Sequence, residues 1–211
     1  MRLLSDVEFR PGADRLIMLG DYVGAHGENI RCLREIERLR ASGAAVALLG
    51  NHDQALCECV ARGGRTAGEL PEIYAYVPRL AAEIRSKHPA LAAMLCGLPL
   101  WYEDETFIAV HAGFNPTLPD WRRSTPEEFT TIRAQFLEHQ PSDLRTVVFG
   151  HTPCQRLHGT PDIWFGEGKV GIDGGAAHGQ QLNCLLFDGR RLLAHAVPVT
   201  GGASTRRHDD V

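Results

Sequence analysis

Short apolar runs that stop abruptly at small or polar residues recur along this chain. Runs rich in Val, Ile, Leu and Phe are typical of strands buried in a sheet. Five of them end in Gly, Asp, Asn or His, and they lie at residues 16–19, 46–49, 107–110, 147–149 and 170–172. Two later runs, at 182–187 and 192–197, predict a hairpin whose turn is formed by Asp188 and Gly189.

Helical patterns separate several of the predicted strands. Residues 28–41 carry apolar side chains at steps of three, which is the spacing of an amphipathic helix. Residues 72–87 also predict a helix, which Pro78 can kink or divide. Residues 126–139 predict a third helix, preceded by a capping box. Alternation of strands and helices predicts an α/β fold with parallel strands and right-handed crossovers.

Polar side chains follow four of the predicted strands. Asp21, Asn51, His111 and His151 each come directly after an apolar run or its closing glycine. Because ligands gather beyond the carboxyl ends of parallel strands, we expect these side chains to converge. Any one of them alone is explained as a turn residue or a hydrogen-bonded histidine, but four strand ends together favour a metal site. Their oxygen and nitrogen atoms suit manganese, iron or zinc, and the next residue, His52, is placed for a general acid.

Composition narrows the class of protein. The chain has 211 residues, of which 44% are hydrophobic and 23% charged, and its formal net charge is -4. This describes an ordinary globular protein with no special affinity for nucleic acid or membranes. We expect a cytoplasmic protein with one domain over 1–198, a flexible polar tail over 199–211, and six scattered cysteines in the reduced state. Cys57 and Cys59 have the wrong spacing for a zinc knuckle.

The motifs occur in a recognisable order: GDYVG at 20–24, GNHD at 50–53, HAG at 111–113 and GHT at 150–152. This order resembles the phosphoprotein phosphatase family of calcineurin-like metallophosphoesterases, in its bacterial serine/threonine branch. Residues 61–67 and 172–179 are also similar to that branch. The resemblance covers the chain to about residue 198. It implies a two-sheet β-sandwich flanked by helices and a site for two divalent ions, with manganese preferred over iron or zinc.

The resemblance also assigns roles to individual residues. Asp21 resembles the carboxylate that bridges both metals. Asn51, His111 and His151 resemble ligands of the second metal, and His52 resembles the general acid.

Further roles follow from the same resemblance. Asp53, which closes the GNHD motif, is counted with His52 among the catalytic residues. Arg133 falls where the family has an arginine that grips the phosphate, so it is expected both to bind substrate and to support catalysis. His178 and His26 are the remaining candidates for substrate binding.

Two departures from the family pattern stand out. Family members begin with a strand ending in Asp-x-His-Gly, which supplies an Asp and a His to the first metal, and no such motif precedes Asp21. We therefore expect the chain to lack its first strand, through a misassigned start, a fragment or loss of catalysis. Gly24 and Ala25 stand where the family has an Asp that orients the acid and an Arg that binds phosphate.

Three functions compete at this stage. The first is metal-dependent hydrolysis of phosphate monoesters, above all phosphoserine and phosphothreonine in proteins, or of a small phosphoester. The second is hydrolysis of a dinucleoside polyphosphate, since the related branch shares LGNHD at 49–53. The third is a catalytically impaired phosphatase fold that binds a partner. The sequence does not fix the substrate, the metal or the oligomeric state.

Overall fold

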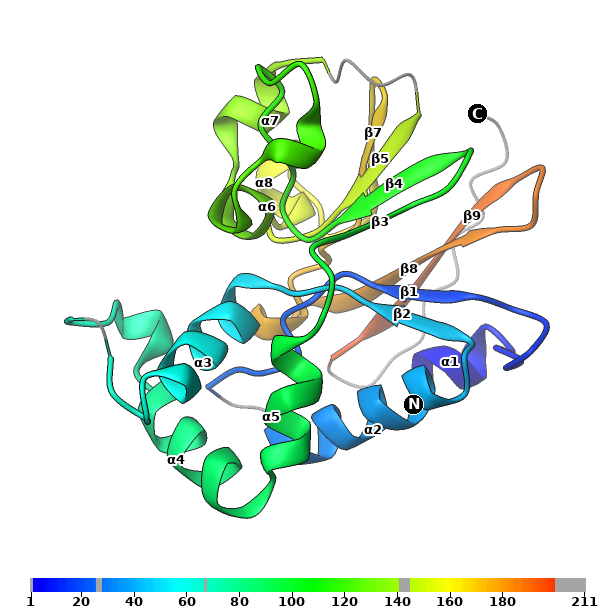
Figure 1. Ribbon diagram of the computed structural model, residues 1–211. Coiled ribbons are helices and arrows are strands. Elements are labelled where there is room, and N and C mark those ends of the chain that lie inside the picture. The colour runs from blue at the N-terminus through cyan, green and yellow to red at the C-terminus, as the bar shows by residue number, and fades with distance from the viewer. Residues whose placement is uncertain (1, 26–27, 67, 141–144, 200–211) are drawn as a thin grey trace.

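Strands occupy the middle of the molecule and helices cover both outer sides (Figure 1). The computed structural model describes residues 2–25, 28–66, 68–140 and 145–199. The first half of the chain forms α1 (Arg2–Asp6), β1 (Leu16–Met18), α2 (Asn29–Ala41), β2 (Ala45–Ala47), α3 (Asn51–Ala61), η1 (Glu72–Tyr74), α4 (Val77–Lys87) and α5 (Pro89–Cys96). The second half forms β3 (Trp101–Glu103), β4 (Phe107–Val110), η2 (Trp121–Arg123), α6 (Pro126–Thr131), α7 (Ala134–Glu138), β5 (Thr146–Phe149), α8 (Cys154–His158), β6 (Trp164–Gly166), β7 (Lys169–Gly171), η3 (Ala176–His178), β8 (Gln181–Phe187) and β9 (Leu192–Pro198).

The largest sheet has five strands in the order β3-β4-β5-β7-β6. Its three inner strands run parallel, while β3 and β6 lie antiparallel at the edges. β1 pairs with β2 in parallel, and β8 with β9 as an antiparallel hairpin. Helices α2 to α5 lie beside the β1–β2 pair, and α6 to α8 beside the large sheet (Figure 1). The predicted α/β fold is confirmed, and it consists of mixed sheets flanked by helices.

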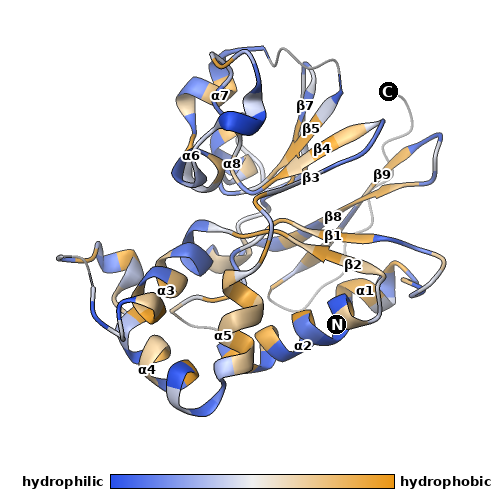
Figure 2. Ribbon diagram, in the orientation of Figure 1, coloured by the Kyte–Doolittle hydropathy of each residue, from blue (hydrophilic) through white to orange (hydrophobic). Residues whose placement is uncertain are grey.

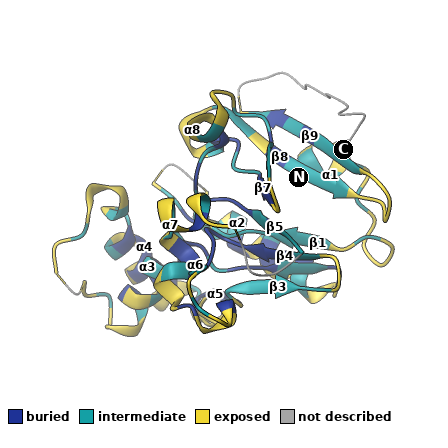
Figure 3. Cartoon of the chain, turned by 90° about the horizontal axis from the view of Figure 1, so that it is seen from above, coloured by how far each residue is buried: buried dark blue, intermediate teal, exposed yellow. Residues whose placement is uncertain are grey.

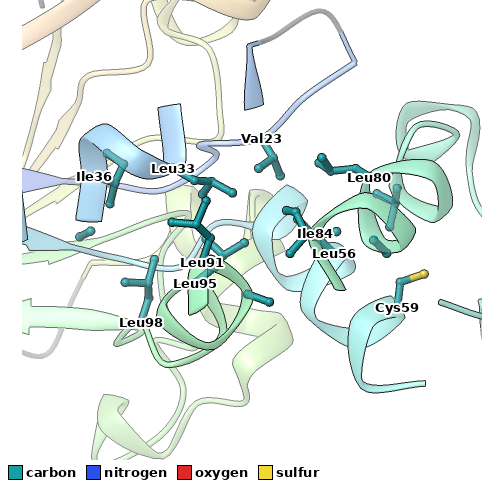
Figure 4. Close-up of a cluster of buried hydrophobic side chains, with 14 residues drawn as sticks. Val23, Leu33, Ile36, Leu56, Cys59, Leu80, Ile84, Leu91, Leu95 and Leu98 are labelled. Carbon is teal, nitrogen blue, oxygen red and sulfur yellow. The ribbon is translucent and has the colours of Figure 1, made fainter. Parts of the chain in front are cut away.

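Two apolar cores hold these layers together. One joins α2, α3, α4 and α5 to β2 through aliphatic side chains such as Leu33, Leu56 and Leu95 (Figure 4). The other is aromatic and packs Phe114, Phe129 and Phe136 against the large sheet, to which Phe149 of β5 belongs. Figure 2 shows the apolar stripes of the helices, and Figure 3 shows buried residues gathered in the strands and along the inner helix faces. The strand ends that carry polar residues therefore project from a rigid base.

Several predicted elements differ in detail. The helix predicted over 126–139 is two helices, α6 and α7, separated at Ile132 and Arg133, where Arg133 has φ -136° and ψ -92°. The helix predicted over 72–87 is divided into η1 and α4, with Pro78 in the first turn of α4. The capping box before α6 and the final hairpin are confirmed.

The expectation of six reduced cysteines is wrong at one pair. Cys57 on α3 and Cys96 on α5 form a disulfide, because helix packing brings their Cα atoms to 5.4 Å. Their separation of 39 residues gives no local signal of this pairing. Among the described residues, Cys32, Cys59, Cys154 and Cys184 are free thiols.

In the described part of the chain, every helix is too short or too polar to cross a lipid bilayer. The polar tail predicted from Thr200 onward lies outside the described residues.

Candidate metal centre

The four polar strand ends meet at one point between the two halves of the fold. Asp21 follows β1, Asn51 opens α3 after β2, His111 follows β4, and His151 follows β5. The backbone N–H of Gly150 donates to the His111 carbonyl at 2.8 Å, which ties the ends of β4 and β5 together. Convergence of these side chains is therefore a consequence of parallel strands ending at the same level.

Ligand-type atoms of three of these residues form a compact group. Those of Asp21, His111 and His151 all lie within 4.8 Å of one another. Asn51 joins the group, because its Oδ1 lies 2.9 Å from Nε2 of His111 and 2.9 Å from Nδ1 of His151. The Asp21 carboxylate lies 3.5 Å from Nε2 of His111. These are the hard and borderline donors that a divalent transition-metal ion prefers.

The hydrogen bonds around His111 fit a cation at this place. Its Nδ1 lies 2.7 Å from the carbonyl oxygen of Leu19, so Nδ1 carries the hydrogen and donates it in a hydrogen bond to that oxygen. In the neutral ring Nε2 then carries no hydrogen, and its lone pair faces the side-chain carbonyl oxygen of Asn51. Two acceptors that face each other repel, and a positive ion bound between them removes the repulsion. A second-sphere carbonyl that fixes the tautomer in this way is common in histidine metal ligands.

His151 is also available as a neutral ligand. Burial, followed by the nearby His111 and Arg133, lowers the pKa of His151 to about 3. Its backbone is held in the left-handed region with φ 61°, as is that of Asp21 with φ 61°. This conformation is uncommon for residues other than glycine, and it is concentrated at functional sites.

Close packing of two glycines lets the Asp21 and Asn51 loops touch. A Cβ atom on Gly50 would overlap the carboxylate and the backbone nitrogen of Asp21. A Cβ atom on Gly20 would stand 2.6 Å from the nitrogen of Gly50 and 2.9 Å from Nδ1 of His111. Gly20 of the GDYVG motif and Gly50 of the GNHD motif therefore leave no room for a side chain.

Asp53 lies behind the group and has 0% exposed surface. Its carboxylate accepts backbone N–H groups from Asp21 at 2.8 Å, from Tyr22 at 3.0 Å and from Gly50 at 3.0 Å. Burial and the neighbouring Asp21 charge raise the pKa of Asp53 to about 8. The side chain thus fastens the Asp21 loop to the start of α3 and has no surface to offer a substrate.

His52 stands beside the group and remains partly accessible. Its backbone N–H donates to Oδ1 of Asp21 at 3.1 Å, and its Nδ1 lies 2.9 Å from the hydroxyl of Tyr76. Burial lowers the pKa of His52, an effect that the Asp21 charge opposes. Tyr74, the last residue of η1, accepts a hydrogen bond from Nδ2 of Asn51 at 2.7 Å.

Arg133 reaches the same strand ends from the break between α6 and α7. Its guanidinium donates to the carbonyl oxygen of His151 at 2.8 Å and to Oγ1 of Thr152 at 2.9 Å. Burial and the nearby Arg156 lower its pKa. The arginine therefore adds positive charge next to the candidate ligands.

Of the remaining predicted site residues, the structure describes His178 and does not bring it together with this group. His178 lies exposed on η3, and within the described residues no hydrogen bond or ion pair joins its side chain to the four ligands. His26 lies outside the described residues. Tyr74 and Tyr76 were not predicted as site residues. The one feature of the sequence that marks them is their position in the segment between α3 and α4.

Comparison with known proteins gives one family and a consistent set of relatives. A match to the family described as calcineurin-like phosphoesterase spans residues 1–173. The chain is 30% identical over 142 residues to the symmetrical bis(5'-nucleosyl)-tetraphosphatase of Haemophilus influenzae, covering 65% of this chain and 46% of the relative. It is 32% identical over 169 residues to the protein of the same name from Methylococcus capsulatus, covering 77% of this chain and 52% of the relative.

The chain thus spans about half the length of the curated relatives it matches. A solved structure provisionally named a diadenosine tetraphosphatase superposes with a TM-score of 0.70 at 24% identity. The superposition covers 95% of this chain and 87% of that one, and it shows a shared fold.

Proposed function

The chain belongs to the calcineurin-like phosphoesterase family, and from this premise we propose that it is a metal-dependent hydrolase of dinucleoside polyphosphates. The observation that carries the proposal is the convergence of Asp21, Asn51, His111 and His151 at the carboxyl ends of four strands. A divalent ion held by these residues supplies Lewis-acid polarisation of a phosphoryl oxygen and activation of water. The Asp21 carboxylate, Asn51 Oδ1 and the ring nitrogens that face it from His111 and His151 would hold the ion.

The choice of substrate follows the relatives rather than the motif order. The sequence motifs favour a phosphoprotein phosphatase, but the curated relatives are named for symmetrical cleavage of bis(5'-nucleosyl) tetraphosphates. These names support hydrolysis of a dinucleoside polyphosphate, in which water is added across the central P–O–P bond. Each half of the substrate then leaves as a nucleoside diphosphate.

His52 is assigned the role of proton donor to the leaving oxygen. It is adjacent to the ligand Asn51, its backbone is held by Asp21, and Tyr76 occupies its Nδ1. Nε2 is therefore the nitrogen that is left to transfer a proton.

Arg133 and Asp53 support the site in different ways. Arg133 places a cation beside His151 and Thr152, where it can stabilise phosphoryl oxygens. We assign Asp53 a positioning role in place of the predicted catalytic one, because its carboxylate is fully buried and accepts three backbone N–H groups.

Product analysis tests the substrate class. The chain is incubated with Mn²⁺ and either diadenosine tetraphosphate or a phosphoserine peptide, and the products are separated by chromatography. We expect ADP as the single nucleotide product, and little phosphate from the peptide. Release of phosphate from the peptide at the higher rate would return the function to the protein phosphatase branch. Equal rates with and without a chelator would contradict the metal requirement.

Metal content is a separate prediction. The described residues contain one group that could hold an ion, so we expect about one equivalent of Mn²⁺ to stay bound after dialysis. Elemental analysis against protein concentration measures this ratio. Two tightly held ions would mean that other side chains complete a second site.

A further inference from the structure

Two tyrosines from one short segment touch the two site side chains that open α3. Tyr74 is the last residue of η1, and Tyr76 precedes α4. The Tyr74 hydroxyl accepts a hydrogen bond from Nδ2 of Asn51 at 2.7 Å, and the Tyr76 hydroxyl lies 2.9 Å from Nδ1 of His52. The same segment therefore contacts both a candidate metal ligand and the candidate acid.

The contact with Tyr74 holds the Asn51 amide with its oxygen toward the candidate metal site. The Tyr74 hydroxyl accepts a hydrogen bond from Nδ2 of Asn51 at 2.7 Å. Oδ1 of the same amide faces the rings of His111 and His151, each at 2.9 Å. With the amide reversed, two hydrogens would point at the place of the cation.

The contact with Tyr76 decides which nitrogen of His52 can act. When the ring carries two protons, Nδ1–H donates to the Tyr76 oxygen, and the Tyr76 O–H donates to the carbonyl oxygen of Val23 at 3.4 Å. The rings of His52 and Tyr76 also stack, with centroids 6.0 Å apart and planes inclined by 14°, while Tyr74 meets His52 edge-on at 5.1 Å. His52 is thereby held so that its other nitrogen, Nε2, makes no hydrogen bond within the described part of the chain and can donate to a substrate.

We propose that Tyr74 and Tyr76 are positioning residues with separate tasks, Tyr74 orienting the metal ligand Asn51 and Tyr76 orienting the proton donor His52. This inference rests on the proposed function for the role of His52, whereas the Tyr74 half rests on metal binding alone. The Tyr76 hydroxyl then fixes the orientation of the His52 ring, as the aspartate of a Ser-His-Asp triad fixes its histidine. Buried packing of Val77 and Leu80 on α4 fixes the segment that carries both tyrosines.

Calorimetric titration of the metal-free chain with Mn²⁺ tests Tyr74. Tyr74→Phe is expected to weaken Mn²⁺ affinity about 10- to 100-fold, the usual effect of removing a partner of a metal ligand. Tyr76→Phe should leave the affinity unchanged. Tyr102→Phe is the matched control, because the partners of its hydroxyl among the described residues are Arg15 and Asp104, neither of which belongs to the site. Unchanged affinity in Tyr74→Phe overturns this half of the proposal.

A series of aryl phosphates at saturating Mn²⁺ tests Tyr76. A proton donor matters for a basic leaving group and hardly at all for an acidic one. Tyr76→Phe is therefore expected to lower kcat about 10-fold or more for phenyl phosphate and less than about 2-fold for dinitrophenyl phosphate. His52→Asn should show the same dependence more steeply, and Tyr102→Phe none.

The outcomes separate the positioning role from the proposed function. Equal losses on both aryl phosphates, or no loss, would show that Tyr76 is structural and would overturn its assignment. Equal losses on the two aryl phosphates in His52→Asn would remove His52 as the acid. Failure of the unaltered chain to cleave diadenosine tetraphosphate would contradict the proposed function. In either case the Mn²⁺ titration still tests the role of Tyr74, and nitrogen NMR of the His52 ring tests the role of Tyr76. The Nδ1 resonance must shift in Tyr76→Phe and stay in place in Tyr102→Phe, and an unshifted resonance overturns the proposal.

Discussion

Asp21→Asn is expected to lower metal-dependent hydrolysis on the order of 10³-fold, the largest effect of any single substitution in this chain. The carboxylate is the one formal negative charge among the four candidate ligands, and it lies 3.5 Å from Nε2 of His111. Its amide isostere keeps an oxygen for the backbone N–H of His52 but loses the charge that holds the ion. Steady-state rates at several Mn²⁺ concentrations measure the loss, together with calorimetric affinity.

Asp188→Asn provides the matched control for this experiment. Asp188 lies in the turn between β8 and β9, where its carboxylate accepts backbone N–H groups of Arg190 and Arg191. It is remote from the site, so hydrolysis and metal affinity should remain at the level of the unaltered chain. Full activity of Asp21→Asn at low Mn²⁺ would remove Asp21 from the ligand set.

Gly50→Ala is expected to damage both stability and hydrolysis. The added Cβ would overlap the carboxylate and backbone nitrogen of Asp21, so the loop after β1 must move. Overpacking of this kind costs roughly 1–3 kcal/mol of stability. A misplacement of about 1 Å at the reacting centre can lower the rate about 100-fold. Chemical denaturation and steady-state kinetics measure the two effects.

Gly68→Ala is the matched control for the glycine experiment, because no heavy atom lies within 4 Å of a Cβ built there. Its stability and rate should match those of the unaltered chain. If Gly50→Ala were as active and as stable as Gly68→Ala, the close approach of the two loops would not matter for the site.

The convergence of the site was predictable because strand ends are marked locally. Each apolar run ends at a residue that does not suit a strand interior, and parallel connections place those ends at one edge. Asp21, Asn51, His111 and His151 could thus be selected from the sequence before their distances were known. The roles assigned to them remain predictions until metal is measured.

What the sequence did not show is decided by tertiary contacts. The backbone of Arg133 leaves the helical region, although residues 126–139 have no proline or glycine after Pro126 to mark the break. The break allows the guanidinium to reach the carbonyl of His151, 18 residues along the chain. The Cys57–Cys96 disulfide likewise depends on the packing of α3 against α5.

The supporting residues were missed for a related reason. Tyr74 and Tyr76 lie 23 and 24 residues along the chain from the side chains they contact, and tyrosines in a loop carry no pattern of their own. Asp53 was assigned to catalysis because it belongs to a motif, whereas its complete burial supports the positioning role that we propose for it. Motif membership predicts that a residue belongs to a site, and burial then decides what it can touch.

The central claim is that Asp21, Asn51, His111 and His151 bind a divalent ion. It is tested most directly by the anomalous difference density of a crystal grown with Mn²⁺. The account predicts a peak in direct contact with the Asp21 carboxylate, Asn51 Oδ1, His111 Nε2 and His151 Nδ1. A fully occupied Mn²⁺ peak elsewhere in the molecule, with no density between these four side chains, would contradict it.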